Sequence, residues 1–145
     1  DAWNTVADGS RYDLWVCGPN GYVRHFKGQM PAGAVARPEL SVRTQRHGQE
    51  LELELVNNGT QPLELLVDES AYLHHGAEAP SHVLGHAHSM TVKPGHTWRR
   101  EWHLAKTGGW YDLRLVAKGF ERRLCGRVES GRASISDPAI ARFGK

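Results

Sequence analysis

The sequence predicts an all-β domain, an antiparallel β-sandwich of the immunoglobulin or fibronectin class. Three observations lead to this prediction. Apolar and polar residues alternate with a period of two in many short segments, turn-forming residues separate these segments, and no segment has a convincing helical pattern. Successive side chains of a strand point to opposite faces of a sheet, so a period of two indicates strands with one buried face. Many short strands joined by regular turns are typical of a sandwich or a barrel.

The clearest alternation lies in residues 49–56, where three leucines alternate with three glutamates. Glutamate and leucine both favour helices, so a helix is the competing interpretation. A helix would distribute the leucines around its circumference, whereas a strand places all three on one face. We therefore predict a half-buried strand with its leucines inward. The leucines are Leu51, Leu53 and Leu55.

The same pattern predicts strands along most of the chain. We expect them at residues 11–17, 21–27, 39–44, 49–56, 62–68, 89–92, 97–103, 110–117 and 120–128. The segments between them, such as Gly18–Gly21, Asn57–Gly59 and Lys93–Gly95, contain the glycine, proline and asparagine that tight turns favour. The longest irregular piece runs from Ala71 to His88.

Length and composition indicate one globular domain. The 145 residues fit a single domain of ordinary size, which we place at residues 1–145 with a core at about 11–139. A net charge of +2 provides no strong field for nucleic acid or an anionic membrane. No apolar run is long enough to span a bilayer. No signal peptide is visible at Asp1, as in a mature fragment or an excised domain, and we expect a piece of a larger exported protein.

Two cysteines, Cys17 and Cys125, leave two interpretations open. They can form one disulfide if the protein is exported, or remain small buried apolar side chains. Two cysteines cannot supply a four-thiolate zinc site.

Histidines are concentrated in the irregular piece, where five fall between His74 and His88. His82, His86 and His88 have a His-x3-His-x-His spacing, and neutral imidazoles suit Zn, Cu or Ni. The pattern names no fourth ligand and no hydrogen-bonded partner for the ligands. We therefore expect a polar loop with surface histidines and no bound metal, and we keep these three residues as the candidate metal site.

Tryptophans provide the largest apolar side chains. Trp98 and Trp102 are four residues apart, so on a strand they share one face. We expect these two and Trp110 to pack between the sheets. The alternative is an exposed tryptophan beside an arginine that inserts at a lipid interface.

No group of residues in the sequence predicts catalysis, and we expect no catalytic residue and no cofactor. Asp68–Glu69 is an isolated acidic pair that we expect in solvent, and Ser130 does not lie in a Gly-x-Ser-x-Gly motif. Four arginines predict a basic patch near the C-terminus, which suits phosphate or the carboxylates of an adjoining domain but, without flanking aromatics, not nucleic acid. They are Arg122, Arg123, Arg127 and Arg132.

One motif occurs twice. Tyr12–Leu14 precedes a turn and then Gly21–Gly28, and Tyr111–Leu113 precedes a shorter turn and then Gly119–Gly126. In each copy the second part reads Gly, aromatic, any, Arg, basic, apolar, any, Gly. Two copies are too few for a solenoid, so we predict two hairpins of one design within a single sandwich.

The two hairpins and the end of the chain carry a family resemblance. The stretch 12–26 resembles the start of the C-terminal domain of bacterial phosphocholine-preferring phospholipases C. Gly108–Leu113, Phe120–Leu124, Gly126–Arg132 and Ser136–Ala139 resemble its end, in the same order and at the right separation. The resemblance covers about residues 12–139.

This resemblance implies a parent protein with a large N-terminal catalytic domain, followed by one or two copies of the small domain. The parent would be a secreted or periplasmic enzyme that hydrolyses phosphatidylcholine or sphingomyelin and releases phosphocholine. The small domain has no assigned chemistry, so no catalytic residue is carried over. We expect an accessory domain that stabilises the catalytic domain or helps it to engage a phospholipid surface. The alternative is a stand-alone module that binds a protein or a ligand such as lipid or carbohydrate.

Overall fold

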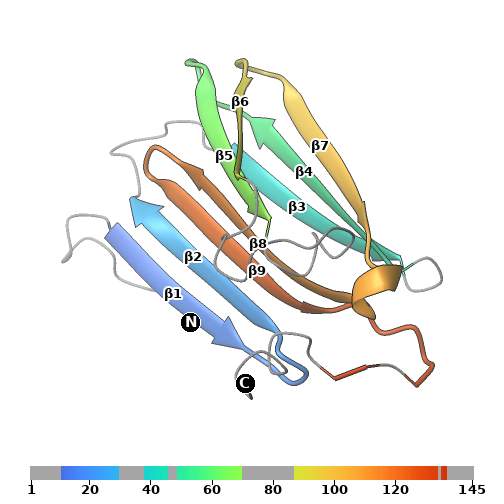
Figure 1. Ribbon diagram of the computed structural model, residues 1–145. Helices are drawn as coiled ribbons and strands as arrows, with labels where there is room; N and C mark the ends of the chain where they lie inside the picture. Colours follow the sequence, from blue (N-terminus) through green and yellow to red (C-terminus); the bar gives the residue numbers. More distant parts are fainter. Residues whose placement is uncertain (1–10, 30–37, 46–48, 70–86, 134, 137–145) are drawn as a thin grey trace.

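The computed structural model describes residues 11–29, 38–45, 49–69, 87–133 and 135–136. These residues form two antiparallel sheets that pack face to face (Figure 1), which confirms the predicted all-β sandwich. Each predicted strand is found. The larger sheet has the order β1-β2-β9-β8-β5-β6, and the smaller has the order β3-β4-β7.

Strand bounds agree with the alternation pattern to within two residues. The larger sheet contains β1 (Arg11–Cys17), β2 (Val23–Gln29), β5 (Leu63–Glu69), β6 (Ala87–Val92), β8 (Trp110–Ala117) and β9 (Phe120–Arg127). The smaller sheet contains β3 (Pro38–Gln45), β4 (Glu50–Asn57) and β7 (Thr97–His103). One short 3₁₀ helix, η1 (Ala105–Thr107), links the two sheets.

The seven strands β3 to β9 form the sandwich itself, with three strands facing four. This division matches the seven-strand immunoglobulin type, in which the chain crosses between the sheets. The hairpin β1–β2 is added at β9 and extends the larger sheet sideways. Figure 1 shows this hairpin, in blue, on the side of the molecule away from β4 and β7.

The core lies between the two sheets, as the alternation requires. The three leucines of β4 are fully buried, and the glutamates between them face outward. The facing strands contribute a second apolar layer from the inner face of the larger sheet, meaning the face toward the smaller sheet. This layer consists of Leu65, Val67, Tyr111, Leu113, Leu115, Phe120 and Leu124.

Two of the three tryptophans occupy the predicted place. Trp98 and Trp102 share the inner face of β7, with ring centroids 6.4 Å apart in an edge-to-face arrangement. Trp110 is also buried, but it lies outside this core, against the turn between β1 and β2. The alternation along β8 explains this, because Tyr111 and Leu113 face inward and Trp110 therefore faces outward.

The second strand begins later than the sequence indicates. We predicted a strand from Gly21, but β2 begins at Val23. Asn20 and Gly21 have φ values of 55° and 67°, and the Gly18 N–H donates a hydrogen bond to the Tyr22 carbonyl at 2.8 Å. These residues therefore form the turn, since positive φ is incompatible with a strand. No helix that could cross a membrane occurs in the part of the chain that is described.

Replacing Leu53 with alanine tests the assigned core. Leu53 is fully buried in the middle of β4, so the substitution removes buried methyl groups and leaves a cavity. We expect the free energy of unfolding to fall by about 2–5 kcal/mol, measured by urea denaturation. The control is Glu101→Ala on the exposed face of the same sheet, for which we expect a change within about 0.5 kcal/mol. Equal effects of the two substitutions would contradict this core.

Candidate functional site

The predicted histidine site is only partly within the described residues. His82 and His86 lie outside them, so the metal hypothesis for this triplet stays a prediction. His88 lies on β6, with Nε2 3.8 Å from Oε1 of Glu69. Glu69 is buried and forms an ion pair with Arg100 of β7. The expectation that Asp68–Glu69 lies in solvent is therefore wrong for Glu69, because the alternation along β5 turns it into the sandwich.

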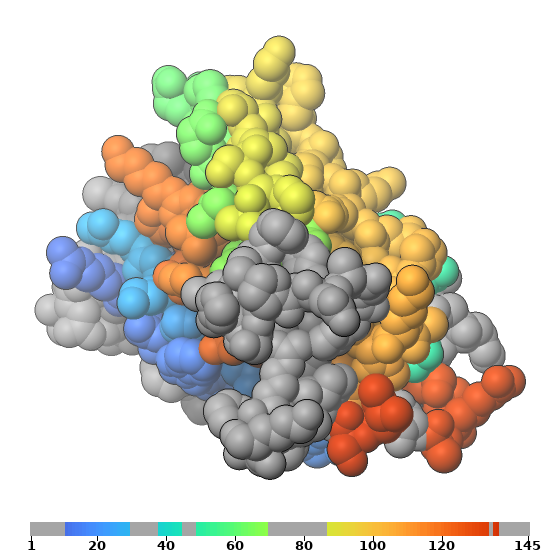
Figure 2. Space-filling model, viewed as in Figure 1, coloured from blue at the N-terminus to red at the C-terminus, as the bar shows by residue number. Residues whose placement is uncertain are grey.

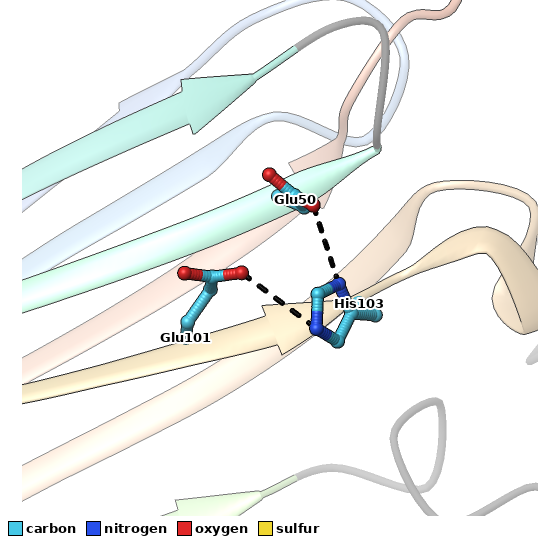
Figure 3. A group of neighbouring side chains, drawn as sticks. All are labelled: Glu50, Glu101 and His103. Carbon is cyan, nitrogen blue, oxygen red and sulfur yellow. Dashed lines mark ion pairs between the residues drawn. The ribbon is translucent and has the colours of Figure 1, made fainter.

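A second histidine cluster was not foreseen from the sequence. Glu50, Glu101 and His103 place one ligand-type atom each within 4.8 Å of one another (Figure 3). His103 Nδ1 lies 3.4 Å from Glu50 Oε1, and Nε2 lies 3.7 Å from Glu101 Oε1. Both ring nitrogens therefore face a carboxylate. Strand register creates the cluster, since Glu50 is directly opposite His103, and no spacing in the sequence reveals that pairing.

Both cysteines are free. Cys17 is opposite Val23, and Val23 is opposite Cys125, so two strand spacings of about 4.8 Å separate the cysteines. A disulfide needs Cα atoms within about 7 Å. The Cys125 thiol donates a hydrogen bond to Asp112 Oδ1 at 3.1 Å, and burial, followed by the charge of Asp112, raises its pKa to about 12. Cys125 is therefore a protonated thiol at neutral pH and not a nucleophile.

The four C-terminal arginines do not form one basic patch. Arg122 faces inward, and its consecutive neighbour Arg123 faces outward and donates two hydrogen bonds to Asp112. Arg127 lies over the ring of Trp110 and near Glu129. Alternation on β9 separates these side chains, and two of the four arginines, Arg123 and Arg127, form ion pairs with a carboxylate.

The repeated motif produces two adjacent hairpins, β1–β2 and β8–β9, within one sheet. They are joined by antiparallel pairing of β2 with β9. Tyr12 is opposite Gly28 in the first hairpin, and Tyr111 is opposite Gly126 in the second. The register across β2 and β9 pairs His25 with Arg123, which are equivalent positions of the two copies. A local pseudo-twofold axis therefore passes between these two residues.

Each hairpin inserts its arginine into the other hairpin. Arg24 donates to the Tyr111 hydroxyl at 2.7 Å, and Arg122 donates to the Tyr12 hydroxyl at 2.9 Å. Each guanidinium also donates across the β2–β9 boundary to a main-chain carbonyl, Arg24 to that of Cys125 and Arg122 to that of Lys27. We call these two equivalent sets the reciprocal arginine contacts.

Aromatic rings complete the reciprocal arginine contacts. The Arg24 guanidinium lies 4.2 Å from the ring centroid of Tyr22, and the Arg122 guanidinium lies 4.3 Å from that of Phe120. These rings occupy the aromatic position of the motif in each copy. A cation over an aromatic face is stabilised by the ring quadrupole, so the motif supplies both the charge and its platform.

The final glycine of each copy makes room for the tyrosine. A Cβ atom on Gly28 would lie 2.7 Å from the Tyr12 hydroxyl oxygen and 2.4 Å from the Gly119 carbonyl oxygen. A Cβ atom on Gly126 would lie 2.9 Å from the Tyr111 hydroxyl oxygen. Both contacts are closer than real Cβ atoms allow, so the glycine is required where the tyrosine crosses the neighbouring strand.

The outer face carries a second equivalent pair of contacts. Asp13 Oδ1 lies 2.6 Å from Nε2 of His25, and Asp112 binds Arg123, so each motif aspartate contacts the basic residue of its own hairpin. The Trp15 indole stacks on His25, with ring centroids 3.9 Å apart. The hydrogen bond with His25 lowers the pKa of Asp13 below its ordinary value, and the charges of His25 and Lys27 act in the same direction.

The chain also matches the family described as "Bacterial phospholipase C, C-terminal domain", over residues 1–29 and 38–127. The chain belongs to this family. It is 36% identical over 146 residues to a non-hemolytic phospholipase C of Burkholderia pseudomallei, covering 97% of this chain and 19% of the relative. It is 36% identical over 135 residues to the hemolytic phospholipase C of Pseudomonas aeruginosa, covering 90% of this chain and 17% of the relative.

A third relative leads to the same assignment. The chain is 31% identical over 147 residues to a non-hemolytic phospholipase C of Pseudomonas aeruginosa, covering 97% of this chain and 20% of that protein. This C-terminal phospholipase C domain thus spans about a fifth of the length of the relatives it matches. The family predicted from the two hairpins is confirmed.

Removing one hydroxyl from each reciprocal arginine contact tests its contribution. We expect Tyr12→Phe and Tyr111→Phe each to lower the free energy of unfolding by about 1.5 kcal/mol, because each leaves one N–H group of a half-buried guanidinium without its acceptor. Urea denaturation monitored by tryptophan fluorescence measures this loss. The control is Tyr22→Phe, whose hydroxyl takes no part in these contacts, and which should leave stability unchanged. A loss of the same size in the control would refute this account.

The Asp13 contact predicts a defined pH dependence. Ionised Asp13 stabilises the folded state, because its pKa is lowered on folding. That stability is present above the unfolded pKa of about 4 and is lost as the pH falls through the lower folded value. Asp13→Asn should therefore lower the melting temperature most above about pH 5, with a difference that vanishes toward pH 2. In a His25→Ala background the difference should be smaller at every pH at which Asp13 is ionised; an unchanged difference there would exclude His25 as the cause.

Proposed function

We propose that this chain is the non-catalytic accessory domain of an exported bacterial phospholipase C, which packs against the catalytic part of the same polypeptide and stabilises it. The observation that carries this proposal is the family match along nearly the whole chain, combined with relatives of which it covers only 17–20%. The chemistry of such an enzyme then belongs to the remaining four fifths.

The ionisable groups of the paired hairpins support a structural role. Asp13, Asp112, Arg24 and Arg122 each contact a partner within the domain. The Cys125 thiol is held protonated. Hydrolysis of a phosphodiester needs a metal or several convergent charged groups on the phosphoryl oxygens, and groups already paired with one another are not free to do this.

The parent enzyme would act on phosphatidylcholine or sphingomyelin and would work outside the cytoplasm. The relatives' names are phospholipases C, which supports the class of reaction. The two lipids and the place outside the cytoplasm are what the family resemblance of the two hairpins implies. Contact with a phospholipid surface is the alternative role for an accessory domain, and a separate measurement tests it.

Phosphatidylcholine hydrolysis by the isolated 145-residue chain is the first test. We expect no release of phosphocholine from the chain alone, whereas the full-length polypeptide should release it. Deleting the domain from the full-length polypeptide should lower the thermal midpoint of the remaining part. Turnover by the isolated chain would refute a non-catalytic role, and an unchanged midpoint after the deletion would refute a stabilising one.

Flotation with phosphatidylcholine vesicles tests the lipid role separately. A purely structural accessory domain should stay at the bottom of the gradient. Wild-type chain that floats, together with a Trp15→Ala variant that does not, would assign the exposed indole to the lipid surface instead.

A further inference from the structure

One edge of the larger sheet exposes apolar side chains. Strand β1 is the outermost strand on its side, and no described strand lies beyond it. Its first half carries the charged residues Arg11 and Asp13, whereas Leu14–Cys17 carries none. Trp15 is 55% exposed and Val16 is 50% exposed. In Figure 2 the blue atoms of the hairpin reach the surface on the side away from β7.

Exposed apolar edges are unusual, because an unpaired strand edge can recruit other chains. Natural sheets usually protect such edges with charged residues, proline or bulges. The first half of β1 has this protection, and the second half does not. The unprotected half is therefore the part of β1 that is suited to accept another strand.

The pseudo-twofold axis relates this edge of β1 to the equivalent edge of β8, which another strand already covers. Leu14–Cys17 of β1 is equivalent to Leu113–Val116 of β8 in the second hairpin. In the second hairpin this segment is covered by β5, which pairs antiparallel with it from Leu113↔Glu69 to Val116↔Leu66. Leu115, the counterpart of Val16, is fully buried there. The same edge is thus occupied in one copy and open among the described residues in the other.

We propose that Leu14–Cys17 is the docking edge for an extended strand from the preceding part of the parent polypeptide. The strand adds antiparallel to β1 as β5 adds to β8, so main-chain hydrogen bonds supply affinity and alternate side chains supply specificity. This inference rests on the proposed function, in which the domain packs against the rest of its own chain.

The length of the parent polypeptide and the chemistry of the edge indicate which strand pairs with Leu14–Cys17. In the relatives about four fifths of the polypeptide lies outside the matched domain. A preceding part of the chain would enter this domain ahead of β1, and such a tether gives a high effective concentration beside that edge. Leu14–Cys17 carries no charge, so its partner strand is uncharged and apolar, with one side chain over Trp15 and the next over Val16.

Cysteine labelling measures occupation of this edge. Cys17 is exposed at the end of β1, whereas Cys125 is partly buried with its pKa raised to about 12. In the isolated chain we expect a maleimide to label Cys17 and not Cys125. In the full-length polypeptide, labelling of Cys17 should slow at least tenfold, and the amides of residues 14–17 should gain protection from hydrogen exchange, as read by mass spectrometry.

A charged substitution provides the matched comparison in the full-length polypeptide. Val16→Glu should restore fast labelling of Cys17, because a charge on the edge disfavours an apolar strand. Ser89→Glu is the control, since Ser89 is exposed on β6 at the opposite edge of the same sheet, and it should leave Cys17 protected. The isolated Val16→Glu chain should melt within a few degrees of the wild type, which shows that the variant folds.

Three results would overturn the proposal, and they are distinguishable. Equal labelling of Cys17 in both proteins, with protection gained elsewhere in the domain, would retain the accessory function and refute the docking edge. No gain of protection anywhere in the domain would refute the accessory function as well. Protection that rises with the concentration of the isolated chain would assign the edge to a second copy of the chain.

Discussion

The attachment of the first hairpin depends on two arginines that cross between strands. The β1–β2 hairpin lies outside the seven-strand sandwich, so β9 is its neighbour in the sheet. Arg24 and Arg122 reinforce this boundary in opposite directions, each reaching the tyrosine of the other hairpin. A half-buried guanidinium is costly unless its donors are satisfied. Here the hydroxyl, the carbonyls and an aromatic face satisfy it, and separating the hairpins would break both sets together.

The sequence was sufficient to predict the strands, but it was not sufficient to predict the side-chain contacts between them. Alternation placed β1, β7 and β8 at their observed bounds, because each strand turns its more buried side chains to one face. The repeat predicted two hairpins of one design, but not that Arg24 binds Tyr111, since that contact requires β2 to pair with β9. Glu50 and His103 met for the same reason, through register. Glu69 was misplaced because its acidic character suggested solvent, whereas the period of β5 directs it inward toward Arg100.

The side chains that the repeat retains are those that the geometry requires. Tyrosine needs glycine opposite it, because a Cβ atom on Gly28 or Gly126 would collide with the phenol. Arginine needs the aromatic residue two positions before it as a platform. The aspartate of each copy pairs with the basic residue that directly follows the arginine of that copy. A recurring motif of this kind therefore identifies an interlocking structure, in agreement with a family described as a C-terminal domain.

The local pseudo-twofold axis is approximate, and its departures from symmetry have a consequence for the surface. Two identical hairpins meeting on a symmetry axis would place the same basic residue opposite itself and would have identical outer edges. Two hairpins with different side chains are free of that restriction. His25 faces Arg123 at the axis, and Trp15 of the first hairpin occupies the position that Arg114 has in the second. One design therefore serves two ends, because β8–β9 completes the sandwich whereas β1–β2 presents an outer edge with a chemistry of its own.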